Sequence, residues 1–275
     1  MMKRRILKIL AFSVAILMIA GVCLFANSLL GNPVSKALAT KTAQQHIDSV
    51  YAGKGLELGD VSYSFKDGYY HAYVSSPSST DMHFTLEING LGTLIHDNYE
   101  YHVLSGWNTA SRIESDYRKL VDNVFSSKSF TYGNDIAYGE ICFASEEYLE
   151  NFNPPSYVIS TKGLEVDAFY NPNEFGAKAG KLTLYVFDDT VSAERLAEIL
   201  LDVRRIFDDA GVSFYLIDCV LEYKADDNGF VESGRVEVMD FLYTDIQEEG
   251  LVERVVASNQ AANDYYSFED EQKSQ

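Results

Sequence analysis

Cysteine is scarce in this sequence, which excludes a fold held together by several disulfide bonds. Only Cys142 and Cys219 lie outside the apolar N-terminal segment, and neither belongs to a CxxC or CxxxxC pair. Two cysteines in roughly 250 residues cannot form the disulfide framework of a small secreted domain. They could form one bridge, but both lie in apolar, strand-like runs, which favours buried free thiols.

Basic residues are also few: the chain holds 22 of them against 41 acidic residues, for a formal net charge of −19. The first 26 residues carry four of the basic residues and none of the acidic ones, so the remainder has a net charge of −23. Such a surface repels nucleic acid and anionic lipid headgroups, because phosphate contacts require Lys and Arg. We therefore expect no nucleic-acid partner, and we interpret the acidic residues as a solvated surface.

The sequence lacks the common motifs of catalysis and nucleotide binding. It contains neither a GxGxxG fingerprint nor a GxSxG nucleophile elbow, and residues 176–180 do not form a phosphate-loop pattern. We therefore predict no catalytic, cofactor-binding or metal-ligating residue, and no cofactor.

An apolar N-terminal segment is the clearest feature that is present. Residues 1–8 contain no acid, and residues 9–26 are apolar apart from Ser13, Gly21 and Cys23. This length suits a helix that crosses the hydrocarbon core of a bilayer, with its positive flank in the cytoplasm. We predict a transmembrane signal-anchor within residues 1–30, and we place everything from residue 27 onward outside the cytoplasm. The basic residues of the flank are Lys3, Arg4, Arg5 and Lys8.

Two other fates of this segment stay open. A secretory signal would be cleaved after Ala26, but Leu24 occupies a position where a small residue is preferred. A lipoprotein would be processed at Cys23, but the preceding Val22 is branched rather than small. The apolar character also continues past residue 27, so the pattern favours an anchor that is retained.

We interpret residues 31–128 as an N-terminal α+β domain. Asn32-Pro33 is typical of a helix start, because Asn caps the first turn and proline needs no donor there. Alternating apolar residues then predict a hairpin over about 57–76, a strand around 84–88, and extended chain from Leu94 to Leu104. A helix that begins at Asn108 or Thr109 closes this domain.

A polar stretch without periodicity, Ser126 to Asn134, is the predicted boundary before a C-terminal α+β domain of residues 135–268. Its order of strand, helix, strand and strand predicts one right-handed crossover and a hairpin. The overall expectation is an α+β fold in which a transmembrane helix precedes two α/β two-layer domains with mainly antiparallel sheets. Strands are expected at about 136–144, 164–169, 181–187, 212–223 and 235–243, a loop at 171–180, a closing helix at 251–266 and a polar tail at 269–275.

The helix expected between Ser192 and Gly211 carries an unbroken apolar stripe. Phe207 lies near the middle of this stripe and should be fully buried against the sheet. Arg204 lies on the polar face, where truncation should cost little.

Several short motifs are similar to those of the YfjL-like family. They are Asn32-Pro33, Lys41-Thr42-Ala43, the runs 63–68 and 74–84, and the run 182–187 with the helix around 196–207. The resemblance covers nearly the whole chain and implies a short, membrane-tethered protein of Gram-positive bacteria with an N-terminal and a C-terminal domain. Its motifs are structural, so it supports a location in the cell envelope and transfers no active site.

All five histidines fall in the predicted first domain. Period two places His71 and His83 together on one exposed strand face, opposite Val74 and Phe84. No pair has a ligand spacing such as HxxxH or HxH, so surface histidines are favoured over a metal site. The five are His46, His71, His83, His96 and His102.

Two loops contain residue types that could carry chemistry. The loop from Ser75 to Asp81, with His83, has the residue types of a hydrolase triad, but an ordinary or partner-binding loop is favoured because no nucleophile elbow is present. Asp226-Asp227-Asn228-Gly229 with Glu232 resembles a calcium loop only weakly, because apolar residues occupy ligand positions, and a hairpin loop is favoured.

These observations favour a non-enzymatic interaction or sensing module of the cell envelope, with the membrane and an envelope protein as its partners. The alternative is a cell-envelope enzyme, such as a metal-dependent hydrolase that uses histidines of the N-terminal domain.

Overall fold

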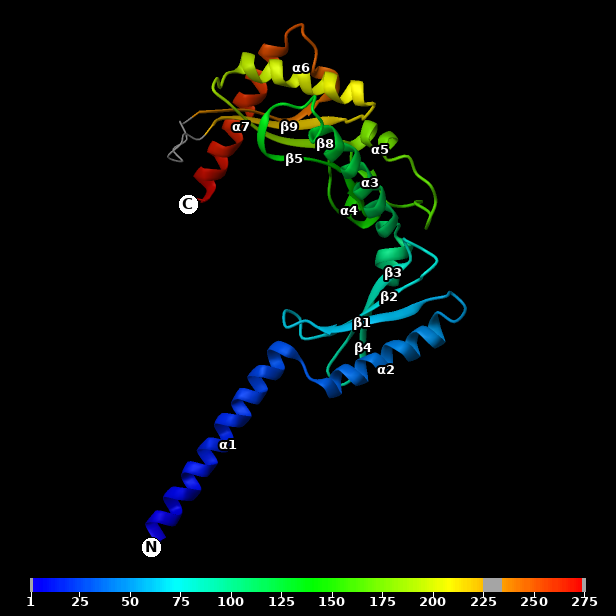
Figure 1. Ribbon diagram of the computed structural model, residues 1–275, viewed down its shortest axis with the longest axis vertical. Coiled ribbons are helices and arrows are strands. Elements are labelled where there is room, and N and C mark those ends of the chain that lie inside the picture. Colours follow the sequence, from blue (N-terminus) through cyan, green and yellow to red (C-terminus); the bar gives the residue numbers. More distant parts are fainter. Residues whose placement is uncertain (1, 225–233, 274–275) are drawn as a thin grey trace. The chain divides into compact units, whose positions relative to one another are not determined.

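The computed structural model describes residues 2–224 and 234–273 (Figure 1). Contacts within the chain define two compact units. The first contains residues 1–109 and 163–167, and the second contains residues 110–162 and 168–275. The weak calcium-loop candidate at Asp226–Gly229 lies outside the described residues.

The N-terminal helix α1 (Met2–Leu30) has the composition of a membrane span. Among the described residues, the helical stretch that begins at Phe12 is the one long and apolar enough to cross a bilayer, with a mean hydropathy of 2.2. None of that apolar stretch is buried against the rest of the protein. By length and composition, α1 therefore matches the predicted transmembrane helix.

In the first unit, helix α2 covers one face of a four-stranded antiparallel meander with the order β1-β2-β3-β4. As predicted, Asn32 caps α2 by accepting a hydrogen bond from the Ser35 N–H (2.8 Å). Ala39, Ala43 and Ile47 of α2 are buried against alternate residues of the strands. The elements are α2 (Pro33–Val50), β1 (Glu57–Tyr63), β2 (Tyr70–Ser75), β3 (His83–Ile88) and β4 (Leu94–Asp97).

The prediction of extended chain from Leu94 to Leu104 is wrong beyond Asp97. The segment η1 (Glu100–Leu104) is a π-helical turn. Asp97 begins the change of direction, because its Oδ1 accepts a hydrogen bond from the Tyr99 N–H (3.0 Å). Tyr99 and Val103 are buried four residues apart, which is the spacing of a helical turn and not of a strand.

The second unit contains a mixed four-stranded sheet with the order β10-β9-β8-β5. The predicted crossover is present, since α6 connects the parallel strands β8 and β9, while the other two pairings are antiparallel. The main elements are α3 (Trp107–Phe125), β5 (Gly133–Ile141), β8 (Gly180–Asp188), α6 (Ala193–Ala210), β9 (Leu216–Tyr223), β10 (Arg235–Leu242) and α7 (Leu251–Lys273). Shorter ones are β6 (Phe143–Ala144), α4 (Glu146–Asn151), β7 (Ile159–Ser160), α5 (Pro172–Ala179) and η2 (Tyr243–Asp245).

Helices α3 and α6 pack together in this second unit. The Phe125 and Phe207 rings lie 5.2 Å apart, and Phe207 is completely buried, as predicted. A Cβ on Gly139 of β5 would lie only 2.6 Å from Val121, so α3 approaches the sheet directly. These contacts place residues 110–128, which we assigned to the first domain, in the second unit. The compact units thus divide after Thr109, whereas the domain boundary expected from the sequence lies between Ser126 and Asn134.

Three further expectations for the predicted C-terminal domain need correction. Residues 164–169 do not form a strand, because Asp167 adopts a left-handed conformation (φ 58°). The expected loop at 171–180 contains α5, which Asn171 caps as Asn32 caps α2. Helix α7 continues to Lys273, so most of the expected tail at 269–275 is helical.

Arg204 is not a freely solvated residue. Its guanidinium donates a hydrogen bond to the Ile246 carbonyl and lies 4.5 Å from the centre of the Tyr243 ring. The polar face of α6 therefore has a packed partner at this position, and truncation of Arg204 should cost more than the sequence indicated.

Candidate functional site

The face of the first sheet that points away from α2 carries polar and aromatic side chains. The register pairs Ser75 with His83 and Tyr73 with Thr85, and both pairs belong to this outer face. Period two predicted that His71 and His83 share a face, and the register confirms it. His71 in turn lies opposite Glu87.

A group of five rings lies on and beside this face, and we call it the aromatic–histidine surface. The Tyr73 ring lies 6.0 Å from that of His83, and the Tyr101 ring lies 5.0 Å from that of His102 and 6.5 Å from that of Trp107. Tyr73 and Tyr101 are 45% and 58% exposed. The surface thus consists of Tyr73, His83, Tyr101, His102 and Trp107, all of them in the first unit.

His102 is affected both by its burial and by the neighbouring His83. Burial, and then the positive charge of a protonated His83, hold the pKa of His102 below its usual value of 6.5. His102 is therefore mainly neutral near pH 7, and its imidazole can both donate and accept a hydrogen bond. Acidification would add positive charge to a surface that is otherwise aromatic.

The remaining histidines are not members of the aromatic–histidine surface, although His71 shares the outer sheet face with His83. His46 of α2 lies 2.6 Å from Asp97, which also accepts a hydrogen bond from Tyr51 (2.7 Å). His71 lies 2.9 Å from Asp67, and His96 is exposed on β4. Within residues 2–224 and 234–273, no group of three or more His, Cys, Asp or Glu side chains is placed to hold a metal ion.

Hydrogen bonds to the buried carboxylate of Asp81 fix the loop from Ser75 to Asp81. Asp81 is 1% exposed, and its carboxylate accepts hydrogen bonds from the Thr109 hydroxyl and the Asp167 N–H, both at 2.9 Å. Asn108 donates hydrogen bonds to the carbonyls of Asp81 and His83. Asp81 therefore fixes the loop, while the His83 ring faces Tyr73, so this arrangement differs from a catalytic triad.

A charged cluster in the second unit was not predicted from the sequence. Lys181 Nζ lies 2.7 Å from Asp218 and 2.9 Å from Asp240, and Tyr157 donates a hydrogen bond to Asp240 (3.2 Å). Burial acts to lower the pKa of Lys181, but the two carboxylates outweigh it and raise the pKa. Lys181 is therefore a fixed ammonium and not a nucleophile. The sequence feature that could have revealed this cluster is Asp218, an aspartate inside the apolar run 215–223.

The two cysteines outside α1 are free thiols, as predicted. Burial, and secondly the charge of Glu140, raise the pKa of Cys142 to about 11. Burial likewise raises the pKa of Cys219. Both are thiols and not thiolates near neutral pH, so neither has the properties of a reactive nucleophile.

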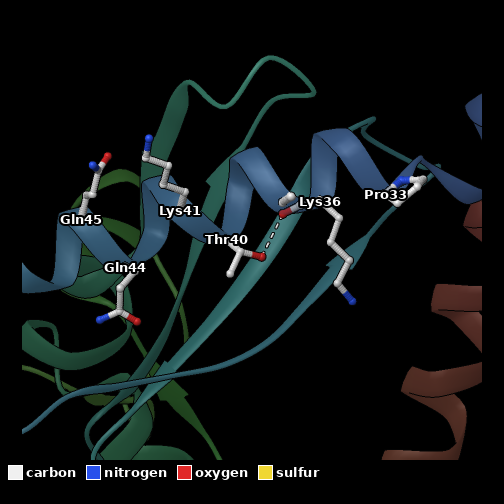
Figure 2. A pocket seen from close by; sticks show the side chains of 7 residues that line it. Pro33, Lys36, Thr40, Lys41, Gln44 and Gln45 are labelled. Carbon is white, nitrogen blue, oxygen red and sulfur yellow. Dashed lines mark hydrogen bonds between the residues drawn. The ribbon is translucent and has the colours of Figure 1, made fainter.

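Two grooves are further candidate sites among the described residues. Figure 2 shows the first, which runs along the exposed face of α2 and is lined by Pro33, Lys36, Ala37, Thr40, Lys41, Gln44 and Gln45. Because these residues all come from one helix, the groove is open and cannot enclose a small ligand. The second lies between α3 and α6, where Val124 and Ile206 are among its apolar walls.

These features define a class of protein: two α+β units that follow an N-terminal helix long enough to anchor them in a membrane. The sequence matches the model of the YfjL-like N-terminal domain over residues 6–121 and that of the YfjL-like C-terminal domain over residues 116–256. The chain therefore belongs to the YfjL-like family. No curated protein and no solved structure was found to match it.

Proposed function

We propose that this protein is a non-enzymatic interaction or sensing module of the cell envelope, anchored by α1 with both units outside the cytoplasm. The observation that carries the proposal is the aromatic–histidine surface, where the exposed ring of Tyr73 lies beside His83 and that of Tyr101 lies beside His102. Exposed tyrosines are characteristic of binding surfaces, because a large rigid ring loses little entropy when it is covered.

The charge of the N-terminus supports the orientation. Lys3, Arg4, Arg5 and Lys8 precede the apolar helix, and no acid accompanies them. An excess of basic residues on one side of a span favours the cytoplasmic location of that side. A reporter enzyme that is active only outside the cytoplasm, fused after Gln275, should therefore be active. Activity of a cytoplasm-specific reporter at the same position would contradict the orientation.

Site-specific photocrosslinking tests the binding surface. A photoreactive amino acid at Tyr101 of the full-length protein should form a discrete adduct with one envelope protein in intact cells. The matched control is Tyr148 of α4, which is 47% exposed and lies in the second unit. Substitution of His83 by alanine should reduce the adduct at position 101. Equal adducts at both positions, or none at position 101, would count against the surface.

The enzyme alternative makes a different prediction. A hydrolase that uses the histidines of the first unit would bind zinc stoichiometrically and gain thermal stability from it. We expect the purified full-length protein in detergent to show neither effect. A rise in melting temperature that saturates at one zinc ion per chain would favour the enzyme and contradict the interaction module.

A further inference from the structure

The junction between α1 and the first sheet holds one end of that sheet close to the end of the apolar stretch. Residues 9–26 form the apolar stretch, which at ~1.5 Å per residue spans about the thickness of the hydrocarbon core. The Tyr63 hydroxyl donates a hydrogen bond to the Ser28 carbonyl (3.2 Å), two residues beyond that stretch. Tyr63 therefore lies at the level of the lipid headgroups when α1 spans a bilayer.

The same junction is closely packed. The Tyr70 hydroxyl accepts a hydrogen bond from the Asn32 N–H (2.8 Å) and donates one to the Asn32 carbonyl (3.1 Å). Gly31 has a φ of 67°, and a Cβ there would lie 2.6 Å from the Tyr70 hydroxyl. Tyr63 and Tyr70 are the last register pair of the β1–β2 hairpin. The end of the hairpin thus cannot move away from the helix end without breaking several contacts.

Both hairpin turns at this end of the sheet expose a large apolar side chain. In an antiparallel meander, the β1–β2 and β3–β4 turns lie at the same end of the strands. Phe65 in the first turn is 63% exposed, and Leu91 in the second is 85% exposed. The second turn also lies against α2, since Thr42 donates a hydrogen bond to the Gly92 carbonyl (2.7 Å). Val34 on the first turn of α2 adds a third exposed apolar side chain.

We propose that the first unit rests on the bilayer that α1 spans, with Phe65 and Leu91 inserted among the lipid headgroups. Aromatic and aliphatic side chains at loop tips gain free energy when they leave water at this depth. The strongly acidic chain offers little attraction to anionic lipid, so the contact is apolar. Phosphatidylcholine should therefore suffice as the lipid, and salt should have little effect. The proposal holds for either side of the membrane and does not depend on the proposed function.

Fluorescent reporters beside the two tips test the contact. The three native cysteines are replaced by alanine, and single cysteines that carry an environment-sensitive dye are introduced by Lys66→Cys, Thr93→Cys and, as a control, Glu100→Cys. Glu100 is exposed in η1, which follows the far end of β4. The full-length variants are reconstituted in phosphatidylcholine vesicles that contain a lipid with a nitroxide quencher near the headgroup. Dyes at positions 66 and 93 should be quenched severalfold more than the dye at position 100.

A second variant separates insertion from simple proximity to the membrane. Phe65→Ser combined with Leu91→Ser should remove most of the excess quenching at positions 66 and 93 and leave position 100 unchanged. Because both side chains are exposed, the melting temperature should stay within a few degrees of the parent. Equal quenching at all three positions would overturn the proposal, as would quenching at 66 and 93 that the serine substitutions do not reduce.

Discussion

Phe207→Ala is the substitution for which the structure gives the most definite energetic expectation. The Phe207 side chain is completely buried, and its ring makes edge-to-face contacts with Phe125 at 5.2 Å and Phe214 at 5.4 Å. It therefore joins three elements, α6, α3 and the segment that leads into β9. Alanine keeps the helix intact but leaves a cavity that none of these rings can fill without moving.

The expected loss has three parts. Removal of a fully buried aromatic ring forfeits about 1.5–3 kcal/mol of transfer free energy. The two ring pairs contribute roughly another 0.5–1.5 kcal/mol each, and the unfilled cavity adds to the cost. Because these contributions are not additive, we expect a total of about 3–5 kcal/mol, as is usual for a buried phenylalanine. Such a loss is large but smaller than the stability of most domains.

The buried thiol of Cys219 provides a local assay. Cys219 lies on β9 in the sheet that α6 covers, and it is fully buried. In a full-length chain whose other two cysteines are replaced, the rate of thiol labelling reports how often this core opens, provided that closing is faster than labelling. A loss of 3–5 kcal/mol corresponds to an increase in labelling rate of roughly two to four orders of magnitude.

Arg205→Ala is the matched control on the same helix. Arg205 is exposed and forms ion pairs with Asp202 and Asp209, which contribute little in water. In the Arg205→Ala variant we expect the labelling rate of Cys219 to change by less than about tenfold. Similar labelling rates for the two variants would refute the packing of α6 on this sheet. Arg204 is unsuitable as the control, because it contacts Ile246 and Tyr243.

Three further predictions concern charges and helix caps. In urea denaturation, Lys181→Met should destabilise the second unit by roughly 3–5 kcal/mol, because it leaves Asp218 buried without its cation. Addition of Asp218→Asn to this variant should restore part of the lost stability. Burial acts to raise the pKa of Asp188, but hydrogen bonds from Arg195 outweigh it and hold the pKa below 3.8. The stability that the Asp188–Arg195 pair contributes should be present above about pH 4 and lost as the pH falls through the lowered pKa of Asp188. The melting temperature of the Asp188→Asn variant should therefore fall less steeply on acidification than that of the parent. Ser192→Ala should cost about 1 kcal/mol by calorimetry, since the Ser192 side chain caps α6 through the Arg195 N–H, whereas Ser192→Asp should keep most of the stability.

Elements that carry both a start signal and an apolar period could be predicted from the sequence. Helix α6 has Ser192 at one end, Gly211 at the other and an unbroken stripe between them. Helix α5 has the same Asn-Pro start as α2 but is only eight residues long, too short to show a period. Local signals therefore predict long elements and miss short ones, whose stability comes from the tertiary contacts around them.

The candidate site was only half predictable for a similar reason. Strand alternation places His71 and His83 on one face, because the two-residue period is a local property. Tyr101, His102 and Trp107 join the surface through the π-helical turn, which Asp97 initiates by a hydrogen bond that alternation cannot reveal. The Lys181 cluster depends on the β10 bulge between Val238 and Phe241, which brings Asp240 within 2.9 Å of Lys181. Such bulges arise from strand pairing and leave no clear pattern in one strand.

The geometry of β2 relates the membrane contact to the binding surface. Tyr70 begins this strand at the end of the sheet that is joined to α1, and Ser75, opposite His83, ends it. Five steps of about 3.3 Å separate the two ends by roughly 17 Å. If Phe65 and Leu91 hold the first end among the headgroups and β2 runs away from the bilayer, His83 and Tyr73 lie beyond the headgroup layer, where a partner can reach them. The anchor and the hairpin tips would then together hold the aromatic–histidine surface clear of the bilayer, which a flexible tether alone would not do.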